Sequence, residues 1–135
     1  KKKILRHCRK IHLINLHGGD PQKYRGLDSH LWCLYHKDFS SLVTTLHHVD
    51  IGIDTGDLIE TLKIKIKKEN SFNNLRIQNV ENCVKLFLNF YNNLKNKKKI
   101  KREKQSKKGR YYSAFPSIFI DKAVKNLKNG KFTKR

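Results

Sequence analysis

The stretches Ile11-His-Leu-Ile-Asn-Leu-His17 and Asp50-Ile-Gly-Ile-Asp-Thr-Gly-Asp57 decide how this sequence is interpreted. The first alternates as a β-strand does, and because strand side chains point alternately to two faces, Asn15 and His17 share a face. A carboxamide donor beside an imidazole can polarise a carbonyl group and move a proton. Asp54 lies on a loop between two glycines, where its carboxylate could orient the imidazole or accept the proton. The two stretches therefore predict a site in which these three side chains have separate roles.

The surroundings of both stretches resemble one enzyme family. The segment Asn15-Leu-His-Gly-Gly-Asp-Pro-Gln-Lys-Tyr-Arg-Gly26, followed by Leu42-Val-Thr-Thr-Leu-His-His-Val-Asp-Ile-Gly-Ile-Asp-Thr-Gly-Asp-Leu-Ile59, is similar to the catalytic half of the folate-dependent formyltransferases. A third segment, Lys108-Gly-Arg-Tyr-Tyr-Ser-Ala-Phe-Pro116, resembles a region near the end of sugar-type members. The resemblance implies an α/β fold, namely the C-terminal part of a Rossmann-like formyltransferase domain with a mixed sheet.

The resemblance also implies a reaction and a set of site residues. Family members transfer a formyl group from the cofactor 10-formyltetrahydrofolate to a primary amine and need no metal. Asn15, His17 and Asp54 fall on the three catalytic positions. The implied cofactor-binding residues are His47, Val49, Asp50, Ile51, Gly52 and Ile53. The implied substrate-binding residues are Gly18, Gly19, Lys23, Tyr24 and Arg25, although a solvent-exposed loop is an equal alternative for the last three.

The resemblance leaves the acceptor open. A sugar-nucleotide amine is the first expectation, because nothing resembles the C-terminal barrel of the methionyl-tRNA enzymes, and methionyl-tRNA is the second. Nothing that resembles the family's front half precedes Ile11, so we expect a fragment, a split gene product or a degraded copy. The alternative is therefore an inactive, truncated remnant or a basic module that binds nucleic acid.

Composition limits the remaining possibilities. The 135 residues suffice for one domain with a modest core. The net charge of +20 fits either a lysine-rich surface or an anionic partner such as tRNA, nucleotide-sugar phosphates or the glutamate tail of folate. Cys8, Cys33 and Cys83 have neither disulfide nor zinc spacing. The sequence shows neither an apolar run long enough to span a membrane nor a signal-peptide pattern, so the cytoplasm is expected. The oligomeric state is not indicated.

Periodicity predicts the order of the elements. One long amphipathic helix is expected over residues 71–95, with an apolar face packed on the core, a dimer surface being the alternative. That face comprises Leu75, Val80, Val84, Phe87, Leu88, Tyr91 and Leu94. The other expected elements are a buried parallel strand over 11–17, a helix over 29–38, a strand over 42–49, a strand near a sheet edge over 58–66 and a helix over 120–129.

Composition shifts divide the chain into three parts. Residues 1–96 are expected to form the partial formyltransferase catalytic domain. Residues 97–109 are rich in lysine and predict a solvated, flexible linker. Residues 110–135 form the last part, in which the stretch 110–119 carries four aromatic side chains that need apolar cover and a helix follows. This last part should therefore dock back onto the domain.

Overall fold

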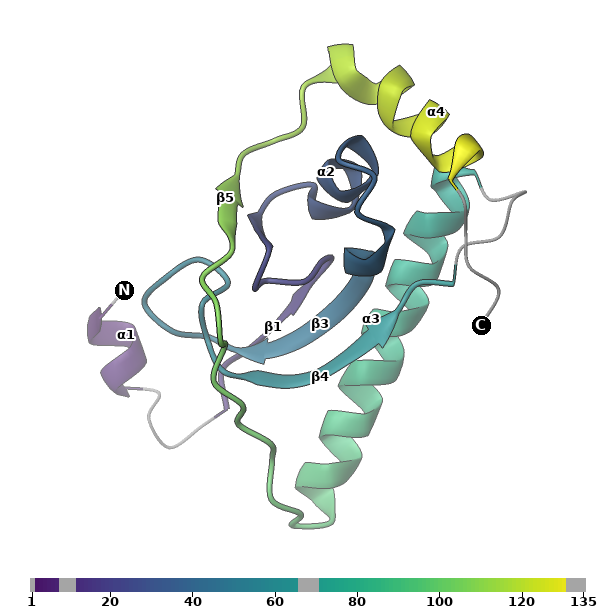
Figure 1. Ribbon diagram of the computed structural model, residues 1–135. Coiled ribbons are helices and arrows are strands. Elements are labelled where there is room, and N and C mark those ends of the chain that lie inside the picture. The colour runs from purple at the N-terminus through teal and green to yellow at the C-terminus, as the bar shows by residue number, and fades with distance from the viewer. Residues whose placement is uncertain (1, 8–11, 66–70, 131–135) are drawn as a thin grey trace.

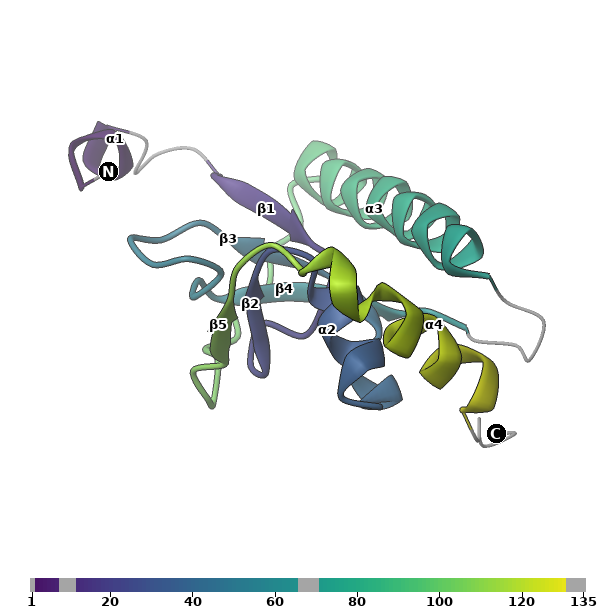
Figure 2. The ribbon, with the colours of Figure 1, turned by 90° about the horizontal axis from the view of Figure 1, so that it is seen from above.

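The larger of two sheets has the strand order β1-β3-β4, and helices lie on both of its sides (Figures 1 and 2). The computed structural model describes residues 2–7, 12–65 and 71–130. The helices are α1 (Lys2–His7), α2 (Ser29–Tyr35), α3 (Phe72–Lys95) and α4 (Ile120–Asn129), with short 3-10 turns at Phe39–Ser41 and Ser117–Phe119. The strands are β1 (Ile14–His17), β2 (Tyr24–Gly26), β3 (Val43–His48), β4 (Leu58–Lys63) and β5 (Arg110–Tyr112).

The strand β3 is central and buried along its whole length. Its sequence is rich in β-branched residues, which suit a strand covered on both faces. It pairs antiparallel with β1 on one side and with β4 on the other. The expectation of a buried parallel strand over 11–17 is therefore wrong, because β1 runs antiparallel to β3 and is only partly buried. Parallel pairing occurs instead in the small second sheet, between β2 and β5.

Two helical layers enclose the larger sheet (Figure 2). On one side α3 packs on β3 and β4, burying Leu86 and Phe90 against Leu46 and Ile59. On the other side lie α2 and α4, which pack on each other. The helix predicted over 29–38 is shorter than expected, because the left-handed φ of 57° at Lys37 is incompatible with helix continuation. The helix predicted over 120–129 is confirmed.

The predicted apolar face of α3 is wrong for most of its members. The buried residues of this helix are Leu75, Leu86 and Phe90, whereas the exposed fraction of Val80 is 61% and that of Val84 is 53%. Phe87, Leu88, Tyr91 and Leu94 are also exposed. The helix is apolar on two faces, so periodicity alone could not select the one that meets the sheet.

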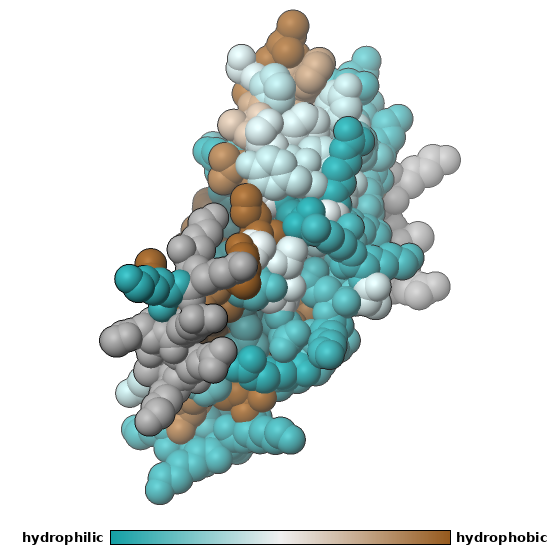
Figure 3. Space-filling model, turned by 90° about the vertical axis from the view of Figure 1, so that its left-hand side faces the viewer, coloured by the Kyte–Doolittle hydropathy of each residue, from teal (hydrophilic) through white to brown (hydrophobic). Residues whose placement is uncertain are grey.

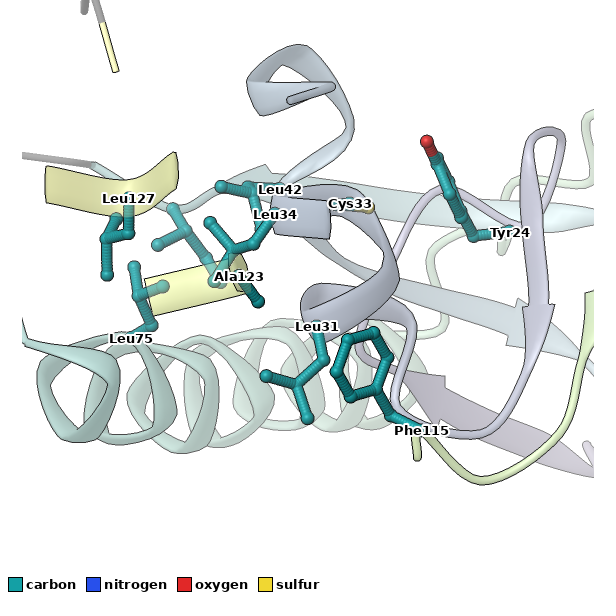
Figure 4. Close-up of a cluster of buried hydrophobic side chains, with 10 residues drawn as sticks. Tyr24, Leu31, Cys33, Leu34, Leu42, Leu75, Phe115, Ala123 and Leu127 are labelled. Atoms are coloured by element: carbon teal, nitrogen blue, oxygen red, sulfur yellow. The ribbon is translucent and has the colours of Figure 1, made fainter. Parts of the chain in front are cut away.

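The tail from residue 110 contacts the rest of the chain at several points. The indole Nε1 of Trp32 donates to the carbonyl of Ser113 at 3.1 Å, and the backbone N–H of Phe115 donates to Asp28 at 2.9 Å. Phe115 lies beside Leu31 in the core cluster that joins α2, α3 and α4 (Figure 4). These contacts fix α4 over α2.

The segment before this tail differs from the solvated, flexible linker that was expected. From Glu103 onward the expected solvated linker has its backbone bound to the domain, although its lysine side chains are exposed. Glu103 forms an antiparallel bridge with Leu58, and the segment then crosses to β5 (Figure 1). We call residues 103–109 the strap. Cys33 and Cys83 are free thiols, whereas Cys8 lies outside the described residues. Within the described ranges, no helix has the length and apolar character to cross a bilayer.

Candidate functional site

Three segments bring the predicted catalytic side chains together. Asn15 and His17 point to one face of β1, and Asn15 lies opposite His47 of β3. The loop after β3 then turns back, so that Asp54 reaches the same face. Asp54 has a left-handed backbone with φ of 53°, a conformation that aspartate tolerates better than most residues. The predicted cluster of Asn15, His17 and Asp54 thus forms in space, and His47 joins it.

Asp54 is the hub of this cluster. Its Oδ1 accepts a hydrogen bond from Nδ2 of Asn15 at 3.1 Å and lies 3.4 Å from Nε2 of His47. Its Oδ2 accepts a hydrogen bond from the backbone N–H of Gly26 at 2.8 Å and lies 3.5 Å from Nδ1 of His17. Burial alone would raise the pKa of this carboxyl, but the contacts with His47, Gly26 and His17 lower it to about 2. Asp54 is therefore ionised at neutral pH.

Acid should weaken the fold through this residue. Because the folded pKa of about 2 lies below the ordinary 3.8, the ionised carboxylate stabilises the protein fully above pH 3.8, and this stabilisation is lost as the pH falls through 2. The side chain is only 9% exposed, so we expect a contribution of about 2 kcal/mol. Urea unfolding of the parent and of Asp54→Asn at neutral pH and near pH 2.5 measures it. The stability difference should shrink in acid; an unchanged difference would contradict the assignment.

His17 is neutral at rest. Burial lowers its pKa below the ordinary value, although the Asp54 charge and the carbonyl of Tyr24 act in the opposite direction. Nε2 lies 2.8 Å from that carbonyl oxygen, which can only accept, so the hydrogen-bond network assigns the proton to Nε2. Nδ1 then carries a lone pair facing Oδ2 of Asp54. A proton taken up at Nδ1 would form an ion pair with Asp54, which suits His17 to the role of a base.

Asn15 uses both hydrogens of its amide inside the cluster. One goes to Asp54, and the other to Nε2 of His47 at 3.2 Å. Nδ1 of His47 lies 2.7 Å from the carbonyl oxygen of His48 and so carries the proton, which leaves Nε2 as the acceptor. The bond to Asp54 ends on a carboxylate and the bond to His47 on a ring nitrogen, so the bond to His47 is the weaker of the two. We therefore expect this bond to be exchanged when Asn15 donates to a bound carbonyl oxygen.

The segment from the end of β1 to the start of β2 contributes contacts to the site that the sequence did not indicate. Gly19 is buried, and a Cβ there would lie 2.7 Å from Cβ of Ser29, so only glycine fits. Lys23 forms an ion pair with Asp38 at 3.3 Å. The side chain of Tyr24 is buried in the core, which corrects its expected role as a substrate-binding side chain; its carbonyl instead fixes His17.

A cavity of about 370 Å³ opens beside His17. Gly18 and His30 line it on one side, and Arg76 and Asn79 of α3 line it on the other. The cavity places a cation and an amide within the same space as the imidazole. Among the residues that the structure describes, no group of three or more His, Cys, Asp or Glu side chains could hold a metal ion.

The loop between β3 and β4 presents apolar side chains to solvent next to the cluster. Val49, Ile51 and Ile53 are 40%, 56% and 45% exposed. Figure 3 views the molecule from the side of this loop and shows hydrophobic atoms interrupting a mainly hydrophilic surface. Arg25 reaches the loop, since its Nη1 donates to the carbonyl of Ile53 at 3.2 Å. The loop therefore presents apolar cover beside the cluster, and of the expected cofactor-binding residues only His47 has its side chain buried there.

Gln105 is a site residue that sequence reasoning missed. Its Nε2 donates to the carbonyls of Asp54 and Gly56, both at 2.9 Å. These bonds hold the left-handed backbone that aims Asp54 at the two histidines. No sequence signal marked Gln105, because it lies in a lysine-rich segment and meets the Asp54 loop only in the folded structure.

Replacement of Gln105 by alanine should disturb Asp54 without removing any group that touches a reacting atom. Two hydrogen bonds of roughly 1 kcal/mol each are lost, so we expect the rate of any reaction that depends on this cluster to fall about tenfold and its pH profile to shift with the pKa of His17. Gln78→Ala is the matched control, since it removes the same side chain from a glutamine that accepts from the backbone N–H of Lys65, away from the loop and the strap. NMR titration of the His17 ring is the second readout. Equal behaviour of the two variants would show that Gln105 has no positioning role.

Known proteins that are similar to this chain include formyltransferases. No family model matches the sequence. The methionyl-tRNA formyltransferase of Thermosynechococcus vestitus is 35% identical over 75 residues, which are 56% of this chain and 22% of that protein. The chain thus spans about a fifth of the length of this relative. Among solved structures, the formyltransferase PseJ from Anoxybacillus kamchatkensis has a TM-score of 0.75 at 22% identity, over 94% of this chain and 69% of that one.

The chain is thus similar in sequence to part of one formyltransferase and similar in fold to another. A second formyltransferase structure, a 4-N formyltransferase from Francisella tularensis, gives a TM-score of 0.66 at 22% identity over 90% of this chain and 55% of that one. The predicted resemblance and the α/β formyltransferase fold are thereby confirmed. The PseJ structure was solved with tetrahydrofolate and a UDP-linked formamido sugar.

Proposed function

We propose that this chain supplies the catalytic cluster of a formyltransferase that moves a formyl group from 10-formyltetrahydrofolate to a primary amine. The observation that carries the proposal is the convergence of Asn15, His17 and Asp54 on one face of β1. A neutral imidazole, an ionised carboxylate and an amide donor are the groups that such a transfer requires. The relationship to formyltransferases supports the reaction class.

The loop after β3 suits the folate group. Its exposed Val49, Ile51 and Ile53 give apolar cover for a flat heterocycle, and the backbone between them offers hydrogen-bonding groups to the edge of that ring. When bound, 10-formyltetrahydrofolate supplies an electrophilic formyl group. The tetrahydrofolate complex of PseJ supports this donor.

The side chains of the cluster then have distinct tasks. Asn15 exchanges its bond to His47 for one to the formyl oxygen, where negative charge develops. His17 takes the proton that the acceptor amine must lose, at Nδ1. Asp54 stabilises the resulting imidazolium and fixes Asn15 through Oδ1. Each task uses a group that the structure already places within the cluster.

The acceptor belongs in the cavity beside His17. Arg76 and Asn79 face it, so a polar or anionic acceptor is favoured. We propose a sugar-nucleotide amine, supported by the fold similarity to PseJ, with methionyl-tRNA as the second candidate, supported by the sequence relative.

Mass spectrometry tests the reaction class and the acceptor together. The protein is incubated with 10-formyltetrahydrofolate and either a dTDP- or UDP-linked amino sugar or methionyl-tRNA, and the formyl mass increment is sought in the product. We expect it on one amino sugar, and its loss in His17→Ala. Steeply salt-dependent tRNA binding without transfer to any amine would instead favour a nucleic-acid-binding module.

A further inference from the structure

A second cavity, of about 410 Å³, lies between the loop after β3 and the strap. Gly52 and Thr55 of the loop line it, together with Arg25 and residues 105–108 of the strap. It is separate from the cavity beside His17, with which it shares no lining residue. The functional site described above makes no use of it.

The walls of this cavity are fixed by hydrogen bonds on both sides of the lysine pair Lys107 and Lys108. Before the pair, Gln105 is bound to the loop, and the backbone N–H and hydroxyl of Ser106 both donate to Oε1 of Gln22 at 2.8 Å. After the pair, the carbonyl of Gly109 accepts from Nε of Arg25 at 2.5 Å. The two lysines are therefore carried by a backbone that is anchored at each end.

The cavity has a strong excess of positive charge. Arg25, Lys107 and Lys108 line it, and no acidic side chain does. Within the part of the chain that the structure describes, neither lysine forms an ion pair, and the contacts of Arg25 are with carbonyl oxygens rather than carboxylates. The nearby carboxylate of Asp50 is turned to the backbone N–H of Gly52 and the hydroxyl of Thr55. Three cations held around one space repel one another, and a bound anion removes that repulsion.

We propose that this cavity binds the multiply charged anionic part, phosphate or carboxylate, of a ligand whose reacting end lies at the Asp54 cluster. The inference rests on the proposed function for the identity of that ligand. The two places are joined directly, since Arg25 holds the carbonyl of Ile53 and Gln105 holds that of Asp54. The anionic groups are either the glutamate carboxylates of the folate donor or the phosphates of a nucleotide-linked acceptor.

Calorimetric binding with paired variants tests this site. The probes are 5-formyltetrahydrofolate with one glutamate, the same compound with five glutamates, and dTDP, each at about 0.15 M salt so that general charge attraction is screened. Lys107→Gln/Lys108→Gln is compared with Lys98→Gln/Lys99→Gln, which removes the same charge from two adjacent exposed lysines outside the cavity. We expect the first variant alone to weaken one multiply charged probe about tenfold.

The outcomes show whether the anionic groups belong to the donor or to the acceptor. They also distinguish a failure of the anion site from a failure of the proposed function. Weakening confined to the pentaglutamate form assigns the cavity to the donor, and weakening confined to dTDP assigns it to the acceptor. Equal weakening by both variants, or by neither, would overturn the anion site while leaving binding of the monoglutamate, and with it the proposed function, intact. Specific dTDP binding without any folate binding would retain the anion site and contradict the proposed function.

Discussion

Replacement of Asp54 by asparagine is expected to lower kcat/KM for formyl transfer by on the order of 10³–10⁴-fold, the scale seen when a carboxylate that orients a catalytic imidazole is neutralised. The two oxygens of Asp54 accept from Asn15 and from the backbone N–H of Gly26. An amide in their place must turn its NH₂ toward one of these donors, so one contact becomes repulsive. The variant also loses the charge that would stabilise protonated His17.

Steady-state kinetics and NMR titration measure the two consequences separately. Because the Asp54 charge raises the pKa of His17, that pKa should fall further in Asp54→Asn. Asp57→Asn is the matched control, since it removes the same charge from the same loop but its carboxylate lies 4.0 Å from Arg102, away from the cluster. A normal rate in Asp54→Asn, or an equal loss in Asp57→Asn, would rule out Asp54 as the hub.

Replacement of Asn15 by alanine should lower kcat by about 10²–10³-fold, the usual cost of removing one donor to a developing oxyanion. The donor acts chiefly when charge develops, so KM should change little. Because Asn15 also gives up hydrogen bonds to Asp54 and His47, its removal should lower the free energy of unfolding by about 1–2 kcal/mol. Kinetics and urea unfolding on the same preparation separate the effects. A kcat within threefold of the parent would exclude Asn15 as the oxyanion donor.

Local patterns predicted the elements whose signals are unambiguous. Val43–His48 is buried on both faces and rich in β-branched residues, and Ile120–Asn129 ends before Gly130, as the sequence indicated. The convergence of Asn15, His17 and Asp54 was predicted from strand alternation together with the resemblance to the formyltransferase motifs. These features depend on strand alternation and on motifs that are short in sequence.

The sequence-based predictions were wrong or incomplete for features that tertiary contacts determine. Two apolar faces of α3 compete for the sheet, and periodicity does not rank them. The family resemblance implied that Tyr24 contacts substrate, yet its ring stacks on Tyr112, which is distant in sequence. Gln105 acquires its role only because the strap crosses the Asp54 loop.

The most direct test of the central claim is transfer of a ¹³C-labelled formyl group from 10-formyltetrahydrofolate to an amine, followed by ¹³C NMR. The account predicts a formamide carbon signal with the parent protein and none above background with Asn15→Ala, His17→Ala or Asp54→Asn over the same time. A signal of equal size from these variants, or no signal from the parent with any amine acceptor, would contradict it.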